Sequence, residues 1–424
     1  MISDNTNTHG LWAATAPAAP PCPALDSDED CDVAVVGAGY TGMSAALHLA
    51  EAGKNVRVLD SHEPGWGCSG RNGGQINPGW KLDLDEIARH YGDAWKDRAI
   101  GVAKEACGTV FELIDRHKID CQAVRSGYVQ GGVGKRGLRQ LQQRCELWQS
   151  VGKDARLLNA RESADLLGTE AYDACMQHPD GGNLQPLSYA RGLTLAAQSA
   201  GTLVHGNSAA ISIEPMGQDW RVRTTNGTLT ARHVVIGTNG YTDNLWPGLK
   251  KAVVPVASVL TATEPLSDNL RESILPALHS VSETIRIQVY YRLDNEGRFV
   301  IGGAGPVWQA AEQGSTAACR AMAERYFPAL KGVKWIYDWA GYPAMTWDKA
   351  PKLMQLAPGV LAGMGYNGRG IAMATMMGKQ LAREITGEGA DLPVTALYQT
   401  PFHALHKFGI FATVTKGRVM DRFD

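Results

Sequence analysis

The chain has 424 residues, of which 44% are apolar and 20% are charged, and its formal net charge is −2. This balance is typical of globular proteins, and the length predicts more than one domain. The near-neutral charge, without a long basic run, argues against nucleic acid as a partner. No apolar stretch is long enough to span a membrane, and the start lacks the apolar core of a signal peptide.

The eight cysteines are scattered, without Cys-x-x-Cys spacing or pairing with histidine. This pattern predicts free thiols, no metal site and a cytoplasmic location. The sequence carries no signal for an oligomeric state.

Residues 1–30 are polar, then rich in alanine and proline, and then acidic. We expect no regular helix or strand here. The segment is interpreted as an arm laid over the surface and anchored by Trp12, with an unattached tail as the alternative.

A βαβ unit follows the arm. Residues 31–36 are apolar and β-branched, as in a buried parallel strand, and residues 56–60 form a second such strand. Between them, residues 43–52 predict a helix that ends at Gly53. This arrangement predicts the first half of a dinucleotide-binding domain.

The turn of this unit reads Gly37-x-Gly39-x-x-Gly42, between strand and helix. The first glycine permits a tight turn, the second a close approach to a pyrophosphate, and the third close packing of helix on strand. Asp60 ends the second strand, where a carboxylate accepts hydrogen bonds from ribose and disfavours NADP. A purely structural turn is the alternative.

The loop at residues 65–77 contains five glycines together with Ser69, Arg71, Asn72 and Gln75. Such a loop can lie along an extended ligand, which favours FAD over NAD. A flexible surface loop is the alternative.

Further elements are expected along the rest of the chain. We expect helices at 86–117, 138–151, 188–200 and about 370–385, and strands at 127–132, 202–205, 209–213, 221–225, 228–232, 234–238 and 359–363. Asn226-Gly227 predicts a hairpin turn. Residues 253–263 and 285–303 alternate as antiparallel strands do.

A second glycine loop, Gly363 to Gly370, also fits the dinucleotide pattern. Its partner acid would be Glu384, which lies at a helix end, so we reject an independent nucleotide site. We expect the helix N-terminus after this loop to face the N1/C2=O edge of a flavin.

Residues 33–53, Ser69-Gly-Arg-Asn-Gly-Gly-Gln75 and Gly365-Tyr-Asn-Gly-Arg-Gly370 resemble the D-amino-acid-oxidase/glycine-oxidase superfamily of FAD oxidoreductases. The second string is similar to the gamma-glutamylputrescine oxidase branch. The resemblance implies a doubly wound, mostly parallel α/β sheet domain that binds FAD and an antiparallel α+β substrate domain. It covers nearly the whole chain.

The resemblance implies a division of the chain. Residues 31–118, 186–248 and 352–390 would form the FAD-binding domain, and residues 119–185 and 249–351 the substrate domain. Residues 391–424 would be a C-terminal segment. The FAD contacts implied are Gly37, Gly39, Tyr40, Thr41, Gly42, Asp60, Ser61, Ser69, Gly70, Arg71, Asn72, Gly73, Gly74, Gln75, Ala210, Ile211, Thr238, Asn239, Gly240, Gly365, Tyr366, Asn367, Gly368, Arg369 and Gly370.

The resemblance also implies the reaction. A neutral amine, for example gamma-glutamylputrescine, would pass a hydride to flavin N5, the imine would hydrolyse, and O2 would reoxidise the flavin. No catalytic acid or base is required. Alternatives are an amino-acid dehydrogenase that reduces a quinone, a flavin hydroxylase that needs NADPH, and a flavoprotein without turnover.

Candidates for the substrate pocket are aromatic residues and one arginine: Trp80, Tyr290, Tyr291, Arg292, Trp308, Trp339, Tyr342 and Tyr366. Arg292 could bind a substrate carboxylate or pair with Asp294. Arg369 stands where the family often has histidine. Gly341 lies near the position of the flavin-linked cysteine of monomeric sarcosine oxidases, so we expect non-covalent FAD, with Cys68 as the remaining covalent candidate.

Overall fold

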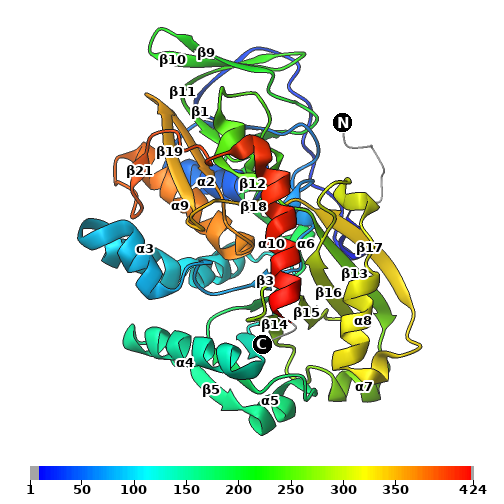
Figure 1. Cartoon of the computed structure of the whole chain (residues 1–424). Coiled ribbons are helices and arrows are strands. Elements are labelled where there is room, and N and C mark those ends of the chain that lie inside the picture. The colour runs from blue at the N-terminus through cyan, green and yellow to red at the C-terminus, as the bar shows by residue number, and fades with distance from the viewer. Residues whose placement is uncertain (1–8, 422–424) are drawn as a thin grey trace.

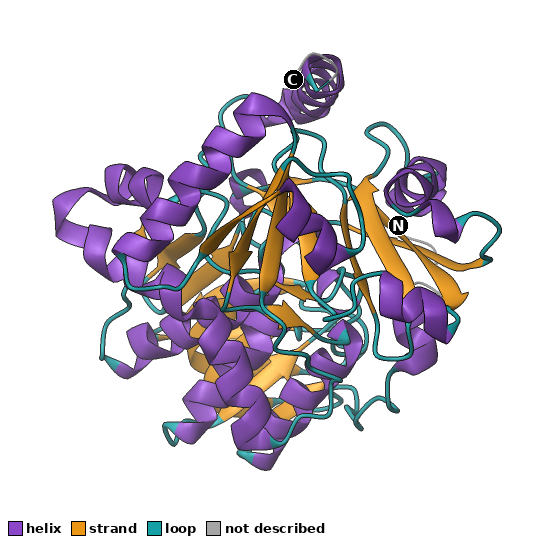
Figure 2. Cartoon of the chain, turned by 90° about the horizontal axis from the view of Figure 1, so that it is seen from below, coloured by secondary structure: helices purple, strands orange, loops and turns teal. Residues whose placement is uncertain are grey.

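The computed structural model describes residues 9–421 and contains two large sheets (Figure 1). In the view of Figure 2, strands gather in the interior and helices lie mostly around them. Among the described residues, no helix combines the length and the apolar character needed to cross a membrane.

The first sheet has nine strands, and its main path runs β21-β19-β20-β11-β1-β2-β8. The five strands from β20 to β8 are mutually parallel, and β9 and β10 extend from β11 as an antiparallel meander. The bounds are β1 Glu29–Val36, β2 Val56–Leu59, β8 Leu203–His205, β9 Ser212–Met216, β10 Asp219–Arg223, β11 Thr228–Ile236, β19 Lys352–Ala357, β20 Val360–Met364 and β21 Val394–Thr395.

Both faces of the central strand β1 are buried, which explains its unbroken apolar run. Val33 and Val35 pack with helices α2 (Tyr40–Glu51), α3 (Leu84–His117), α6 (Pro186–Ser199) and α9 (Gly370–Thr386). Ala34 and Val36 face a second apolar cluster made by strands and loops. α2 packs directly on α9, so the two helices that begin at glycine turns lie side by side.

The second sheet has eight strands in the order β17-β13-β16-β15-β14-β4-β6-β5, antiparallel except for the pair β14 and β4. Its separate apolar core includes residues of β13, β15, β16 and helix α8. The bounds are β4 Tyr128–Gly132, β5 Arg156–Asn159, β6 Ala174–His178, β13 Ser258–Pro265, β14 Ser280–Glu283, β15 Tyr290–Leu293, β16 Arg298–Ala304 and β17 Trp335–Gly341.

The remaining elements are short or peripheral. Two-stranded sheets join β3 (Gln75–Ile76) to β7 (Gly182–Asn183) and β12 (Val254–Pro255) to β18 (Ala344–Met345). The other helices are α1 Leu11–Thr15, α4 Gly134–Ser150, α5 Ala160–Leu167, α7 Asp268–Ser273, α8 Ala317–Tyr326 and α10 His406–Met420. Figure 1 shows α10 crossing the front of the molecule.

The arm differs from the sequence-based expectation in two places. Leu11–Thr15 forms the short helix α1, and β1 already begins at Glu29. The expectation of no regular structure was wrong here because tertiary contacts stabilise the helix: Leu11 and Trp12 are completely buried. The anchoring role of Trp12 is confirmed, whereas residues 1–8 lie outside the described residues.

Other expected elements also shift. The strands expected at 228–232 and 234–238 are one strand, β11, and the hairpin at Asn226-Gly227 is confirmed. The strand expected at 209–213 begins only at Ser212, because pairing with β10 determines its start. The long helix α3 contains a kink at Gly92, whose φ is 63°.

The strands of the two sheets alternate along the chain. The nine-stranded sheet uses residues 29–59, 203–236 and 352–395, and the eight-stranded sheet uses residues 128–178 and 258–341. The α/β fold with a mostly parallel sheet and a second antiparallel domain is confirmed. The domain boundaries given above stay a proposal.

Candidate functional site

The first βα turn adopts the geometry that its glycines predict. Gly37 has a φ of 103°, a conformation that side chains rarely allow. A Cβ at Gly42 would lie 1.8 Å from the carbonyl oxygen of Gly37 and 3.1 Å from Val35 Cγ1. Gly42 therefore permits the helix to approach the strand, and the N-terminus of α2 faces the cavity described below.

Asp60 follows the second parallel strand and lies beside this turn. Its Oδ2 accepts the amide of Ala38 at 2.7 Å, and its Oδ1 accepts the amide of His62 at 2.9 Å. The carboxylate opens to the cavity but is otherwise surrounded by protein, and this burial raises its pKa to about 6. Each oxygen keeps a lone pair that can accept a ribose hydroxyl.

The loop at residues 65–77 is held by its own side chains. Ser69 Oγ accepts the amide of Tyr40 at 3.0 Å, at the start of α2. The Asn72 amide donates to the carbonyl oxygens of Cys68 and Ser69 at 3.1 and 2.8 Å and accepts from Gly74 N at 2.9 Å. The loop is therefore braced against the nucleotide-binding turn.

Arg71 lies in this loop with a fully buried side chain. Its Nε donates to the carbonyl oxygen of Trp66 at 2.8 Å, and its guanidinium stacks 4.3 Å from the centroid of the Trp66 ring. Nη1 is 3.5 Å from Glu312, but neither Nη1 nor Nη2 has a hydrogen-bond partner. Because Arg71 lines the cavity, these unsatisfied donors fit a ligand that supplies acceptor oxygens, as FAD does.

The second glycine loop closes the site from the other side. Tyr366 Oη and Thr41 Oγ1 are 2.6 Å apart and connect this loop to α2. Asn239 Oδ1 accepts the amide of Gly365 at 3.0 Å, and Asn367 braces the loop by accepting the amide of Thr346 at 2.8 Å. α9 begins at Gly370, so its N-terminal amides and partial positive charge face the cavity.

A cavity of about 440 Å³ connects these parts and extends to the second sheet. This volume is typical of ligand sites. The cofactor residues expected from the sequence that line it are Gly37, Gly39, Tyr40, Thr41, Asp60, Ser61, Ser69, Arg71, Asn72, Gly73, Gln75, Ala210, Thr238, Asn239, Gly240, Tyr366, Asn367, Gly368, Arg369 and Gly370.

Five expected cofactor residues do not line the cavity: Gly42, Gly70, Gly74, Ile211 and Gly365. The four glycines support the loops from behind, since an added Cβ at each would lie within 2.5 Å of protein atoms. Ile211 is 60% exposed to solvent and lies directly before β9, outside the lining of the cavity.

Of the substrate-pocket candidates, Tyr290 and Tyr366 line the cavity. Tyr290 Oη is 2.9 Å from Ser258 Oγ. Trp339 lies behind the loop and donates to the Arg71 carbonyl oxygen at 2.9 Å. Tyr291 is buried in the core of the second sheet, 2.8 Å from Tyr172 Oη.

The other candidates also lie away from the cavity. Trp80 is buried beside a small pocket, and Trp308 is 50% exposed near α10. Tyr342 accepts the amide of Ala311 at 2.7 Å.

Arg292 adopts neither of its two expected roles. It is buried and donates to the carbonyl oxygens of Gly73 and Leu184 at 2.8 and 2.7 Å. Its guanidinium lies 5.0 Å from the centroid of the Trp12 ring, whereas Asp294 pairs with Arg298 at 3.1 Å. Arg292 thus ties the cofactor loop to the arm, an arrangement that sequence spacing cannot reveal.

The structure adds cavity residues that the sequence did not indicate: Lys81, Ser258, Ser282, Gln288 and Met345. Lys81 follows closely after the glycine-rich loop, so extending that loop by a few residues would have found it. The others come from distant strands and loops, and no local pattern marks them.

A parallel sheet with a glycine turn, a strand-end carboxylate and a cavity shared with a second sheet defines a dinucleotide-binding protein with room for a second ligand. The sequence pattern of the "FAD dependent oxidoreductase" (DAO) family matches residues 32–384, and the chain belongs to this family. FAD is therefore the cofactor of this enzyme.

Individual proteins agree with this assignment. The chain is 33% identical over 387 residues to gamma-glutamylputrescine oxidoreductase of Escherichia coli (strain K12), covering 90% of each chain. The solved structure of glycine oxidase from Geobacillus kaustophilus matches with a TM-score of 0.70 and 21% identity, over 84% of this chain and 95% of that one. L-proline dehydrogenase from P. horikoshii matches with a TM-score of 0.72 and 20% identity, over 87% and 96%. At these identities the two structures show the fold alone.

Proposed function

We propose that the protein oxidises a C–N bond of a small amine, with a gamma-glutamylated amine such as gamma-glutamylputrescine as the first candidate. The observation that carries this proposal is the 33% identity to gamma-glutamylputrescine oxidoreductase over 90% of both chains. The proposed FAD contacts are the expected residues that line the cavity, above all the first βα turn, Asp60, Arg71 and the start of α9.

Bound FAD would supply the chemistry, namely acceptance of a hydride at N5 and delivery of the electrons to an acceptor. The chain would bind and orient the amine in the part of the cavity next to the second sheet. Leu260 and Tyr290 give this part apolar surface, and Ser258 and Gln288 give it polar groups. Enclosure between the two sheets would exclude water and hold the C–H bond in place.

Carboxylates are sparse in the cavity as a whole. Among the described residues that line it, the carboxylates are Asp60 and Asp243. Asp60 ends a strand of the nucleotide-binding sheet, and Asp243 accepts the amide of Leu245 at 2.9 Å. We therefore propose that the amine reacts in its neutral form, without a carboxylate as catalytic base.

The proposal is tested by mixing the holoenzyme anaerobically with amines and following the visible flavin absorption. Gamma-glutamylputrescine should bleach the flavin in a single-turnover reaction, and putrescine serves as the counterpart without the glutamyl group. Failure of every amine, amino acid and N-methyl amino acid to bleach the flavin would favour a flavoprotein without turnover.

We also propose the cytoplasm as the location of the protein. The eight cysteines are all free, which is compatible with a reducing compartment.

We further propose O2 as the electron acceptor. Aerobic turnover should release hydrogen peroxide in equal amount to the product. Turnover that needs an added quinone and releases no peroxide would instead identify a dehydrogenase.

A further inference from the structure

Two cations line the cavity at the ends of the flavin-binding loops: Lys81 follows the first loop, and Arg369 lies in the second, where it can reach both the flavin edge and a substrate. Lys81 Nζ donates to Gln288 Oε1 at 3.2 Å, which connects the segment after β3 to the second sheet. Arg369 immediately precedes α9 and lines the same cavity. Arg369 donates to the carbonyl oxygen of Pro78, in the short segment that leads to Lys81, so the two charges lie near each other, and Arg369 disfavours the charged form of Lys81.

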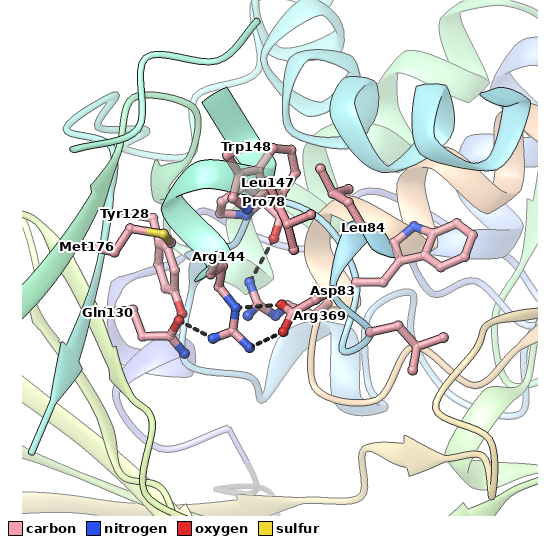
Figure 3. Close-up of a pocket in the computed structure, with 12 residues that line it drawn as sticks. Pro78, Asp83, Leu84, Tyr128, Gln130, Arg144, Leu147, Trp148, Met176 and Arg369 are labelled. Atoms are coloured by element: carbon pink, nitrogen blue, oxygen red, sulfur yellow. Dashed lines mark hydrogen bonds and ion pairs between the residues drawn. The ribbon is translucent and has the colours of Figure 1, made fainter. Parts of the chain in front are cut away.

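Neither cation has a carboxylate partner among residues 9–421. Arg369 donates to the carbonyl oxygen of Pro78 at 2.8 Å, and its guanidinium lies 5.3 Å from the centroid of the Tyr128 ring. The carboxylate near Lys81 is Asp83, and Arg144 binds it with two hydrogen bonds of 2.5 and 2.9 Å. Figure 3 shows Arg144 directed at Asp83 and Arg369 directed at Pro78.

This end of the cavity is therefore electropositive. The N-terminus of α9 adds a partial positive charge next to Arg369. A cavity wall whose cations lack a carboxylate partner attracts a small anion and repels a second cation, and the exposed Lys81 and half-buried Arg369 are both open to such an anion. The neighbouring small pocket, of about 20 Å³, has room for about one water and offers no space for a ligand.

We propose that Lys81 and Arg369 form an anion subsite that binds the carboxylate of the substrate. The inference rests on the proposed function and specifies its substrate class: an amine that also carries a carboxylate, as a gamma-glutamylated amine does. A plain diamine, whose charged groups are all positive, would be bound poorly.

The charge state of Lys81 gives the subsite a testable pH dependence. Partial desolvation at the cavity wall and the neighbouring Arg369, Arg144 and Lys349 lower the pKa of Lys81, against the opposing effect of Asp83, while the exposed side chain keeps contact with solvent. A bound carboxylate favours the ammonium form and raises this pKa. Carboxylate binding should therefore weaken as the pH rises through the pKa of Lys81, and binding near that pH should take up a proton.

The test measures dissociation constants of butyrate and its neutral isostere butyramide for the holoenzyme, by calorimetry and by the change in flavin absorption. Wild type should bind butyrate at least tenfold more tightly than butyramide. Lys81→Met should weaken butyrate binding about 10- to 100-fold, the size expected for a hydrogen bond to a charged group, and leave butyramide within threefold. Lys81→Arg should retain most of the affinity for butyrate.

Lys349→Met is the matched control, because Lys349 contributes to the same field without lining the cavity. It should change butyrate binding by less than threefold. Equal binding of butyrate and butyramide by wild type, or unchanged butyrate affinity in Lys81→Met, would overturn the subsite. If butyrate binds through Lys81 while no amine bleaches the flavin, the proposed function fails and the subsite stands.

Discussion

The substitution Asp60→Asn tests the nucleotide-binding end of the cavity. Both carboxylate oxygens accept backbone amides, from Ala38 at 2.7 Å and His62 at 2.9 Å. An asparagine offers one acceptor oxygen, so its NH2 group must face one of these donors. Leaving one donor unsatisfied costs about 1–3 kcal/mol. The substitution also removes the charged group that accepts a hydrogen bond from the FAD ribose, which costs a similar amount of binding free energy. The Kd for FAD should therefore rise about 10- to 100-fold.

The assay is a fluorescence titration of FAD into the apoprotein, together with urea unfolding without FAD. Asp32→Asn is the control, because Asp32 accepts the amide of Asn55 at 2.7 Å on the same sheet but does not line the cavity. Asp32→Asn should leave the Kd for FAD within twofold of wild type. A Kd of Asp60→Asn within twofold of wild type would refute the assigned role of Asp60.

The pH dependence gives an independent check of the same reasoning. Burial raises the pKa of Asp60 to about 6 in the protein without cofactor, so the group becomes neutral as the pH falls below that value. FAD affinity of wild type should therefore fall as the pH decreases from 7 to 5, whereas that of Asp60→Asn should stay nearly constant across this interval. Parallel pH curves for the two proteins would contradict the assignment.

Three further predictions concern the arm and the cofactor loops. Trp12 is completely buried and donates to the Asn72 carbonyl oxygen at 2.8 Å. Trp12→Ala should therefore destabilise the protein by about 3–5 kcal/mol in urea unfolding and weaken FAD binding. The control Trp347→Ala, at a 70% exposed position, should change the stability by less than about 1 kcal/mol. Burial raises the pKa of the Cys68 thiol to about 11, so the reactive thiolate that could bond to the flavin is scarce at neutral pH. Acid precipitation of the holoenzyme should therefore release all flavin into the supernatant. Flavin retained in the protein pellet would show a covalent bond. Gly42→Ala should abolish FAD binding because its Cβ would lie 1.8 Å from the Gly37 oxygen, while Gly101→Ala, a helical position with no atom within 4 Å, should bind FAD normally.

The candidate site divides into a part that is local in sequence and a part that is not. The glycine turn, Asp60 and the second glycine loop each lie within a few residues of a strand or helix end, so their patterns predicted their places around the cavity. The pocket aromatics and Arg292 could not be placed in this way. An aromatic residue in an alternating strand gives no sign of which sheet face covers a core and which faces a ligand.

The amino-acid sequence by itself determined the βαβ unit, the dinucleotide-binding turn and the family, because backbone conformation at glycines and strand periodicity depend on neighbouring residues. Only the tertiary structure decided that Arg292 braces the arm, that Arg71 has unsatisfied donors, and that Lys81 and Arg369 face one cavity. These outcomes depend on contacts between segments far apart in the chain. Such contacts also decide whether a charged side chain has a partner of opposite charge.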